Sequence, residues 1–366
     1  MVSGYEELST PAVVIDLDIM EANIVAMAER LRTRGIQHRP HIKSHKSLQI
    51  ARRQLAAGAT GITVAKLSEA ETFVRGGITN LLIAYPIIGE DKLQRLAALH
   101  RLADLTVTAD SIAGAEGLSR VGVKTGKPLR VLVEIDGGLH RGGRQPGEDA
   151  LAFARRIVGL PGLEVCGLMG YFGTVYRQSG MEGLRAAVRE ESAIMGESAE
   201  RFRAAGLSVN VVSTGSSPAG LLCEELTGVT EVRAGNYAFF DASAVAMGLA
   251  REEDCALRVV ATVVSTPLPG YATIDAGTKT LTSDRAHHRE DYGIVIGRPD
   301  VRIAGLNEEH GFLRYDPEGT VLSVGDRLEI IPNHSCVLPN LCDRVAGRRQ
   351  GVFAEWIVID ARGCSD

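Results

Sequence analysis

The run Leu129-Arg130-Val131-Leu132-Val133-Glu134-Ile135-Asp136 indicates the fold class. Val131, Val133 and Ile135 fall on one face of an extended chain and Leu132 falls on the other, so both faces carry apolar side chains. A strand that is apolar on both faces is typical of a parallel sheet whose two sides are covered. The run therefore predicts an α/β protein built on buried parallel strands.

Similar strand-like runs lie on both sides of this one and alternate with amphipathic stretches of helical period. The strands are predicted at 38–43, 61–66, 80–85, 105–110, 129–136, 164–171, 209–214 and 230–233, and the helices at 18–34, 47–57, 68–75, 91–102, 110–118 and 181–205. Asp110 or Ser111 is a candidate N-cap. Eight strands over residues 35–247 fit the roughly 250 residues of a (β/α)8 TIM-type barrel. An open doubly wound sheet is the alternative, because it has the same alternation.

The pattern changes after about residue 250, where no long helical stretch follows. Short strand candidates are separated by Pro and Gly turns and predict a C-terminal antiparallel β domain, with strands at 257–265, 271–274, 292–296, 301–306, 327–331 and 355–359. An additional apolar strand at 12–17 is expected to join it. We therefore predict a barrel over residues 10–247 and a β domain over 248–366, joined by residues 1–17.

Composition excludes several classes of function. Of the 366 residues 45% are hydrophobic, and the formal net charge is -5 without a basic block, which argues against nucleic-acid binding. No apolar run approaches the ~20 residues of a membrane span. Residues 1–7 lack the features of a signal peptide. The six cysteines form no CxxC pair, so we expect a reducing, cytoplasmic location.

Two loops at predicted strand ends suggest an anion site. In a barrel of this type the loops after strands seven and eight often bind phosphate. Here they read Thr214-Gly215-Ser216-Ser217, which is expected to open a helix, and Ala234-Gly235-Asn236. Glycine lets backbone N–H groups approach an anion, and a helix N-terminus favours its charge. Ordinary strand-to-helix turns use the same residues, so the two loops together are only a candidate.

Three lysines near strand ends are candidate amine nucleophiles. Lys43 follows the first predicted strand, Lys66 the second, and Lys46 lies further into the first loop. Desolvation at a barrel mouth can lower the pKa of a lysine and make it nucleophilic. Most lysines are simply solvated or ion-paired, so position alone does not select among the three.

A family resemblance separates them. The run Arg39-Pro40-His41-Ile42-Lys43-Ser44-His45-Lys46 resembles the RPHxK(T/S)HK motif of the D-threonine aldolase and D-serine dehydratase family, which belongs to the alanine-racemase-like, fold-type III enzymes that use pyridoxal 5'-phosphate (PLP). The likeness continues through residues 9–16, 133–138, 275–279 and 332–336. It implies a barrel followed by a β domain, PLP held as a Schiff base on Lys43, and a homodimer.

His334 and Cys336 are the second specific feature. They stand two apart after a predicted strand, and period-two geometry would place both side chains on one face. Imidazole and thiolate are good zinc ligands, although a lone HxC pair is more often a buried cysteine beside a histidine. Similarity to the family's metal motif favours the metal reading. Related aldolases often carry aspartate at the third position, so Cys336 favours zinc over manganese or magnesium.

Other side chains have expected supporting roles. By similarity, Arg141 hydrogen-bonds the phenolic oxygen of PLP, or else forms a salt bridge away from it. Tyr171 lines the cofactor ring or packs at the barrel mouth. The phosphate cradle consists of Thr214, Gly215, Ser216, Gly235 and Asn236, with a hydroxyl from Tyr237. For His41 and His45, structural hydrogen bonding is favoured over proton transfer.

These features predict a PLP- and metal-dependent lyase that acts on small 3-hydroxy-D-amino acids, with His334 also taking part in catalysis. The first hypothesis is a D-threonine aldolase, and the alternative is a D-serine or D-threo-3-hydroxyaspartate dehydratase. An amino-acid racemase fits the metal pair less well, and a PLP carrier lacks the second domain. The sequence departs from relatives with a GYEGH-like run, because it has Phe172 and Thr174 there, and this puts the substrate in doubt.

Overall fold

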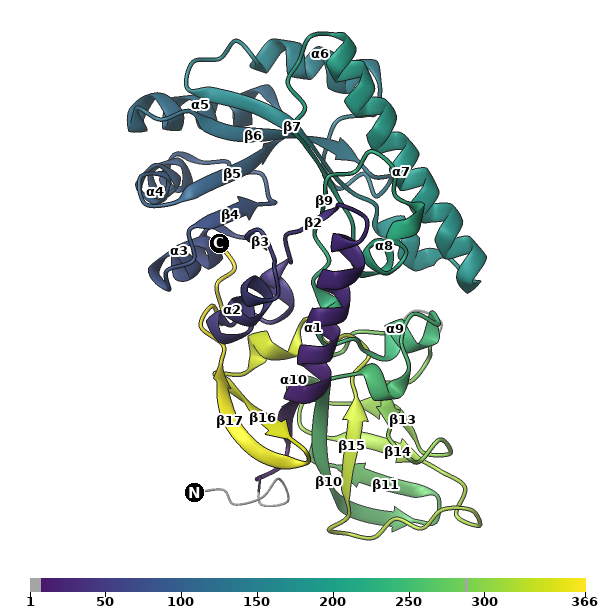
Figure 1. The fold of residues 1–366 in the computed structure, drawn as a ribbon. Coiled ribbons are helices and arrows are strands. Elements are labelled where there is room, and N and C mark those ends of the chain that lie inside the picture. The colour runs from purple at the N-terminus through teal and green to yellow at the C-terminus, as the bar shows by residue number, and fades with distance from the viewer. Residues whose placement is uncertain (1–7, 287–288) are drawn as a thin grey trace. The chain divides into compact units, whose positions relative to one another are not determined.

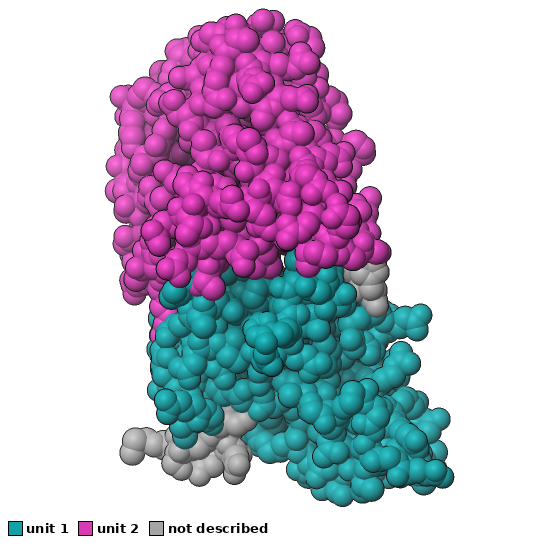
Figure 2. Space-filling model, turned by 45° about the vertical axis from the view of Figure 1, so that its right-hand side comes forward, with its two compact units in different colours: residues 1–25, 44–50, 236–363 teal, residues 26–43, 51–235, 364–366 magenta. Residues whose placement is uncertain are grey.

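The structure is a computed structural model that describes residues 8–286 and 289–366. The chain forms two compact units, each assembled from separate segments of sequence (Figure 2). Unit 1 comprises residues 1–25, 44–50 and 236–363, and unit 2 comprises 26–43, 51–235 and 364–366. The domain boundary expected at residue 247 stays a prediction, because compactness alone does not show which segment folds independently. The residues behind the signal-peptide prediction, 1–7, lie outside the described residues.

Unit 2 is the predicted barrel (Figure 1). Eight parallel strands follow one another in the order β2-β9-β8-β7-β6-β5-β4-β3. A bridge between His41 and Thr63 joins the two edges of this sheet, with the Thr63 N–H donating to the Pro40 carbonyl over 2.8 Å. The strands are β2 (Gln37–His38), β3 (Ile62–Val64), β4 (Asn80–Ile83), β5 (Asp104–Ala109), β6 (Leu129–Asp136), β7 (Leu163–Tyr171), β8 (Val211–Thr214) and β9 (Glu231–Val232).

Helices follow these strands on the outside of the curled sheet. They are α2 (Leu48–Ala56), α3 (Leu67–Arg75), α4 (Glu90–His100), α5 (Ile112–Thr125), α6 (Glu148–Ile157), α7 (Gly180–Ala204) and the short α8 (Ser217–Leu221). Ser111 is the N-cap of α5 and accepts from the Gly114 N–H. Helix α6 was not predicted, although Ala150, Leu151, Ala154 and Ile157 are buried at helical spacing.

The first barrel strand is much shorter than predicted. β2 ends at His38, and residues Ile42–Ser44 form a turn of 3-10 helix. Pro40 explains the difference, because it has no N–H to donate to a strand ladder. Lys43 therefore lies on a helical turn beyond the strand, not at its last position.

Unit 1 contains a mostly antiparallel sheet. Its strands run in the order β13-β14-β11-β10-β1-β16-β17, with β15 paired to both β10 and β12. β1 pairs antiparallel with β10 and parallel with β16, which confirms that the N-terminal strand joins this sheet. The strands are β1 (Ala12–Asp16), β10 (Leu257–Leu268), β11 (Tyr271–Ile274), β12 (Ile294–Val295), β13 (Arg302–Leu306), β14 (Gly311–Arg314), β15 (Arg327–Ile331), β16 (Arg344–Arg349) and β17 (Val352–Val358).

The helices assigned wholly to unit 1 are short, as the sequence predicts for residues beyond 250. They are α9 (Ala242–Ala246) and α10 (Thr278–Leu281), while α1 (Leu17–Arg32) contributes residues to both units. The β14 and β16 strands were not predicted. Arginine occurs at three of the six positions of β16, at 344, 348 and 349, and conceals its alternation. None of the six cysteines, all of which lie among the described residues, is in a disulfide, and no described helix has the length and hydrophobicity to cross a membrane.

Candidate active site

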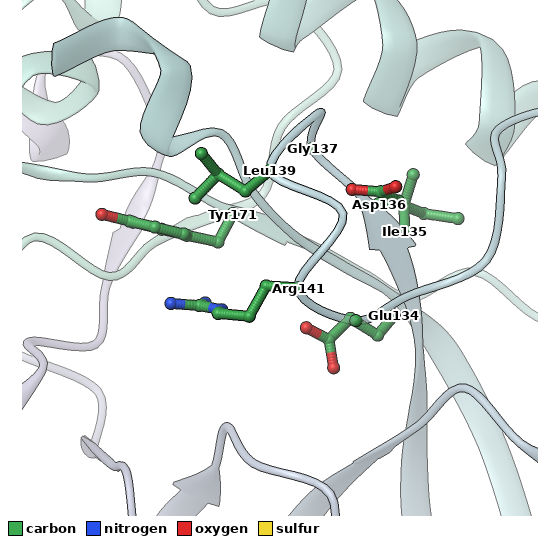
Figure 3. Close-up of a pocket in the computed structure, with 8 residues that line it drawn as sticks. Glu134, Ile135, Asp136, Gly137, Leu139, Arg141 and Tyr171 are labelled. Atoms are coloured by element: carbon green, nitrogen blue, oxygen red, sulfur yellow. The ribbon is translucent and has the colours of Figure 1, made fainter. Parts of the chain in front are cut away.

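The site in unit 2 is built around the ring of Tyr171, the last residue of β7. The Lys43 Nζ lies 5.9 Å from the ring centroid, and the Arg141 guanidinium carbon lies 4.9 Å from it. Figure 3 shows the Arg141 and Tyr171 side chains running in the same direction, away from Asp136. The structure thus brings together three residues that the sequence assigned to cofactor binding from separate parts of the chain.

The loop after β6 places Arg141 at this position. Asp136 organises it: one carboxylate oxygen accepts from the Gly138 and His140 N–H groups, and the other from the His140 ring over 2.6 Å and from Gln145. A small open hollow lies against this loop, lined by Glu134, Ile135, Asp136, Gly137, Leu139, Arg141, Gly142 and Tyr171. The Arg141 side chain lines this hollow.

Two roles were predicted for Arg141, a hydrogen bond to the phenolic oxygen of PLP or a salt bridge away from it. Its side chain is exposed, and within residues 8–286 and 289–366 no carboxylate forms an ion pair with it. The salt-bridge alternative is therefore absent from the described part of the chain. Lys43 is exposed as well, so burial by the described residues does not supply the desolvation that the sequence suggested for it.

The two rival lysines have different neighbours. Lys46 donates from Nζ to the Asn340 side chain over 2.9 Å, and its carbonyl accepts from the Ala361 N–H. Lys66 lies 3.9 Å above the ring of Tyr85. Of the three lysines, Lys43 is the one for which the structure gives a second cation at the same aromatic ring.

The two histidines of the motif, His41 and His45, each accept a hydrogen bond from the backbone two residues further along the chain. The Nδ1 of His41 accepts from the backbone N–H of Lys43, and the Nδ1 of His45 accepts from that of Ser47. Each ring thereby holds the backbone two residues further on, as short polar side chains do in turns. This agrees with the structural reading of both histidines.

A buried carboxylate on α7 hydrogen-bonds the turn after β8. The Thr214 hydroxyl donates to Glu191 of α7 over 2.6 Å, so its single proton is already engaged. Gly215 has φ +97°, which favours glycine. The Ser216 hydroxyl caps α8 by accepting from the Ala219 N–H. The Thr214 hydroxyl and the Gly215 backbone both hydrogen-bond Glu191, whereas the Ser216 backbone N–H can face an anion.

The turn after β9 requires a glycine. A Cβ on Gly235 would lie 2.4 Å from the carbonyl oxygen of His41, closer than any non-bonded contact allows. Tyr237 is buried, with 1% of its surface exposed. The side chain of Asn236 is held by two partners of unit 1: it donates to Asp241 over 2.7 Å and accepts from the Ser335 hydroxyl. Its contribution to a phosphate cradle would therefore come from its backbone.

Buried charges lie behind these turns in unit 2. Arg233 donates to Ser213 and to the Gly170 carbonyl over 2.7 and 2.6 Å. Burial raises the pKa of Glu191 to about 7, against the effects of its hydrogen bond from Thr214 and of Arg233. Burial, assisted by the charge of Asp110, also raises the pKa of Glu134. Sequence reasoning assigned no role to Glu191, because a carboxylate on a charged helix gives no sign of burial.

The candidate metal pair lies in unit 1. β15 ends at Ile331, so the pair occupies a bend and turn and not the extended context that was predicted. Alternation still holds, because Asn333 and Ser335 are buried while His334 and Cys336 are partly exposed. The negative charge of Cys336 and its hydrogen bond raise the pKa of His334, and Asp241 and Asp284 add to this.

The donor chemistry of this pair fits a metal. The Nδ1 of His334 lies 2.9 Å from the Asp284 carboxylate, so a metal would bind through Nε2. Among residues 8–286 and 289–366, no three His, Cys, Asp or Glu side chains converge as a closed metal site. A metal held here would have two protein ligands and open positions for water or substrate.

Phe172, at the position where the sequence departs from relatives, is 5% exposed. It packs close to Gly170, where an added Cβ would lie 2.8 Å from its ring. Its position is therefore in the barrel wall.

Comparisons with known proteins agree with this arrangement. Residues 15–243 match the family "Alanine racemase, N-terminal domain", and residues 256–347 match a serine dehydratase domain. The chain is 39% identical to D-threo-3-hydroxyaspartate dehydratase of Delftia sp. (strain HT23), over 90% of this chain and 91% of that protein. The crystal structure of D-threonine aldolase from Filomicrobium marinum has a TM-score of 0.93 and 31% identity, covering 100% and 99% of the two chains.

Solved variants of a D-threo-3-hydroxyaspartate dehydratase add a chemical detail. They share 34% and 36% identity with this chain at a TM-score of 0.89, covering 97% of it and 96% and 98% of theirs. Their substitutions replace a histidine and a cysteine two positions apart, and the cysteine variant is described as metal-free. In the present sequence that spacing occurs once, at His334 and Cys336.

The matched domains, the extent of these similarities and the barrel with its separate β sheet lead to one conclusion. The chain belongs to the D-threonine aldolase and D-serine dehydratase-like family of fold-type III PLP enzymes.

Proposed function

We propose that this protein is a PLP- and divalent-metal-dependent lyase of 3-hydroxy-D-amino acids. The observation that carries the proposal is the approach of Lys43 and Arg141 to the ring of Tyr171 at the end of β7. A primary amine, a permanent cation and an aromatic face are the groups that a pyridine aldehyde with an acidic phenol requires. When bound, PLP supplies an electron sink for negative charge developing at the substrate Cα.

The residues of unit 2 would divide the work as follows. Lys43 Nζ would hold the cofactor covalently, and the same amine would be the group that accepts the Cα proton of the substrate. Arg141 donates to the phenolic oxygen, and the Tyr171 ring lines the cofactor. Backbone groups of Ser216 and Gly235 bind the phosphate.

In unit 1, Asn236 and Tyr237 would bind phosphate, and His334 and Cys336 would hold the metal. Asn236 contributes its backbone, and Tyr237 a hydroxyl. His334 Nε2 and Cys336 Sγ hold the metal ion, and the thiolate favours zinc over manganese or magnesium. When bound, the metal supplies a Lewis acid for the β-hydroxyl of the substrate. Asp284 contacts Nδ1 of His334 and would thereby orient the ring for metal binding through Nε2.

We place elimination of water first and retro-aldol cleavage second, the reverse of the order suggested by sequence. What supports elimination is Cys336, because the hydroxyaspartate dehydratase from which those variants were made has a cysteine two positions after a histidine, whereas aspartate there is typical of aldolases. What supports cleavage, as in D-threonine aldolase, is the close structural match over the whole chain. Both reactions need the same activated β-hydroxyl.

Product analysis with D-threonine decides between them. Elimination gives 2-oxobutanoate and ammonia, and cleavage gives glycine and acetaldehyde. With D-threo-3-hydroxyaspartate the corresponding products are oxaloacetate with ammonia, or glycine with glyoxylate. Formation of neither pair, or inversion of the substrate at Cα alone, would contradict the proposal.

The role of Lys43 is tested by absorbance. The purified protein with PLP is expected to absorb at about 420 nm, as PLP bound to a lysine does. Lys43→Ala should abolish the band, and Lys66→Ala, the matched control, should keep it because Lys66 lies against Tyr85 instead. A band that persists in Lys43→Ala and disappears in Lys66→Ala would show that the cofactor binds Lys66 and not Lys43.

We also infer a homodimer in the cytoplasm. The family resemblance supports the dimer, and Val264, Leu268 and Tyr271 leave apolar surface exposed on β10 and β11. Six cysteines outside disulfides suit a reducing compartment. Light scattering after gel filtration measures the mass, and a value of one chain would contradict the dimer.

A further inference from the structure

A buried cluster in unit 1 supports the turn that carries His334 and Cys336. The Asp241 carboxylate is 1% exposed and has three N–H donors. Oδ2 accepts from the Asn236 side chain over 2.7 Å and from the Ser335 backbone over 3.1 Å, and Oδ1 accepts from the Ala244 N–H over 3.1 Å. The Ser335 hydroxyl donates to Asn236 and closes the cluster.

The turn is anchored through alternate residues. Asn333 and Ser335 are 1% and 0% exposed and bond inward, and their neighbours His334 and Cys336 are partly exposed. The Asn333 carbonyl accepts from the Ser243 hydroxyl over 2.8 Å, and its side chain donates to the carbonyls of Asp284 and Asp291. Every inward-facing residue of the turn is thus fixed by hydrogen bonds.

Asp241 is costly to bury and has no counter-ion among the described residues. One oxygen of Asp241 caps α9 through the Ala244 N–H, and the other accepts from Asn236 and Ser335. Oδ2 accepts from the backbone N–H of Ser335, the residue that stands between His334 and Cys336 in the chain. A negative charge behind a cation site strengthens cation binding, and partners behind the ligands fix their orientation.

We propose that Asp241, with Asn236 and Ser335, is a positioning cluster that sets the metal affinity of the His334–Cys336 turn. The proposal rests on the metal site of the proposed function. Asn236, which directly follows Gly235 in the chain, hydrogen-bonds both Asp241 and Ser335 through one side chain.

The test is metal affinity of the full-length protein with PLP bound, measured by zinc competition with a chromophoric chelator. Asp241→Asn keeps the size and loses the charge and an acceptor. We expect zinc to bind about 10–100-fold more weakly, the range seen when partners of metal ligands are removed. Cobalt(II) should give a weaker thiolate charge-transfer band, because Cys336 is less well placed. The absorbance at about 420 nm should be retained, since Lys43 is untouched.

Asp326→Asn is the matched control. Asp326 also accepts a backbone N–H, from Ser323 over 2.8 Å, in a turn before β15. Its zinc affinity and cobalt spectrum should equal those of the wild type. Wild-type affinity and spectrum in Asp241→Asn would overturn the inference. If that variant does not fold, Asn236→Ala is measured in its place: weaker zinc binding supports the cluster, and wild-type affinity overturns it.

Failure of the proposed function gives a different result. If the wild type binds no zinc, or if His334→Ala retains stoichiometric metal, the metal site itself is wrong. If His334→Ala loses the metal and Asp241→Asn binds it as tightly as wild type does, only the positioning cluster is wrong.

Discussion

At the scale of single residues, the barrel buries a carboxylic acid whose ionisation destabilises the folded state. Glu191 is fully buried on α7 and accepts from Thr214, and burial raises its pKa to about 7 from an ordinary value of 4.5. The folded state therefore favours the protonated acid. The stability that this gives is fully present below pH 4.5 and is lost as the pH rises to about 7.

We predict that Glu191→Gln removes this pH dependence. A glutamine carbonyl still accepts from Thr214, and the side chain carries no charge to desolvate. Between pH 5 and pH 8 the wild type should lose up to roughly 3 kcal/mol of unfolding free energy more than the variant does. Urea unfolding at both pH values measures this. Glu190→Gln, its exposed neighbour on α7, should follow the wild type, and parallel profiles for all three proteins would contradict the prediction.

At the scale of elements, the packing of α5 against the start of β7 depends on a close backbone approach. A Cβ on Gly122 of α5 would lie 1.8 Å from the carbonyl oxygen of Gly162, and its other near neighbours are backbone atoms of the same residue. Beside this contact the Ser119 hydroxyl donates to the Pro161 carbonyl over 2.6 Å. The helix cannot accept a side chain there without moving away from the barrel.

Two helical glycines should therefore respond oppositely to alanine. Gly122→Ala should destabilise the protein by about 1–3 kcal/mol or more, because backbone must shift. Gly196→Ala, in α7, meets only one atom, at 3.8 Å, and should stabilise by about 0.5–1 kcal/mol, because alanine loses less backbone entropy in a helix. Shifts of the urea midpoint measure both. Equal effects of the two substitutions would show that the close approach is not what holds α5.

At the scale of the whole molecule, the chain order and the compact units do not coincide. The unit 1 sheet needs β1 from the N-terminal segment, which pairs with β10 on one side and β16 on the other. Leu8 and Val14 also join Val260 and Ala346 in its core. A fragment that begins at residue 248 would contain β10 and β16 but would lack β1, the strand that pairs with both of them.

We predict that residues 248–366 do not fold alone and that a peptide of residues 8–25 restores them. Circular dichroism should show cooperative unfolding only in the mixture. A shuffled peptide of the same composition is the control and should have no effect. Cooperative unfolding of the fragment by itself would show that β1 is dispensable and would support an independent C-terminal domain.

The sequence by itself determined the repeating strands and helices, because hydrophobic period is a local property of the chain. It also singled out Lys43 and the His334–Cys336 pair, since their motifs are contiguous. β16 and the early end of β2 were not predicted, the first because its arginines conceal the pattern and the second because Pro40 interrupts the ladder.

Only the tertiary structure decided which partners the polar groups take. It gave the Thr214 hydroxyl to Glu191, which is 23 residues away, and the Asn236 side chain to Asp241 and Ser335, the latter 99 residues away. It also placed Lys43 and Arg141 at one tyrosine ring. Such pairings follow from which strands become neighbours and which side chains are buried between them, and no local pattern of residues records that.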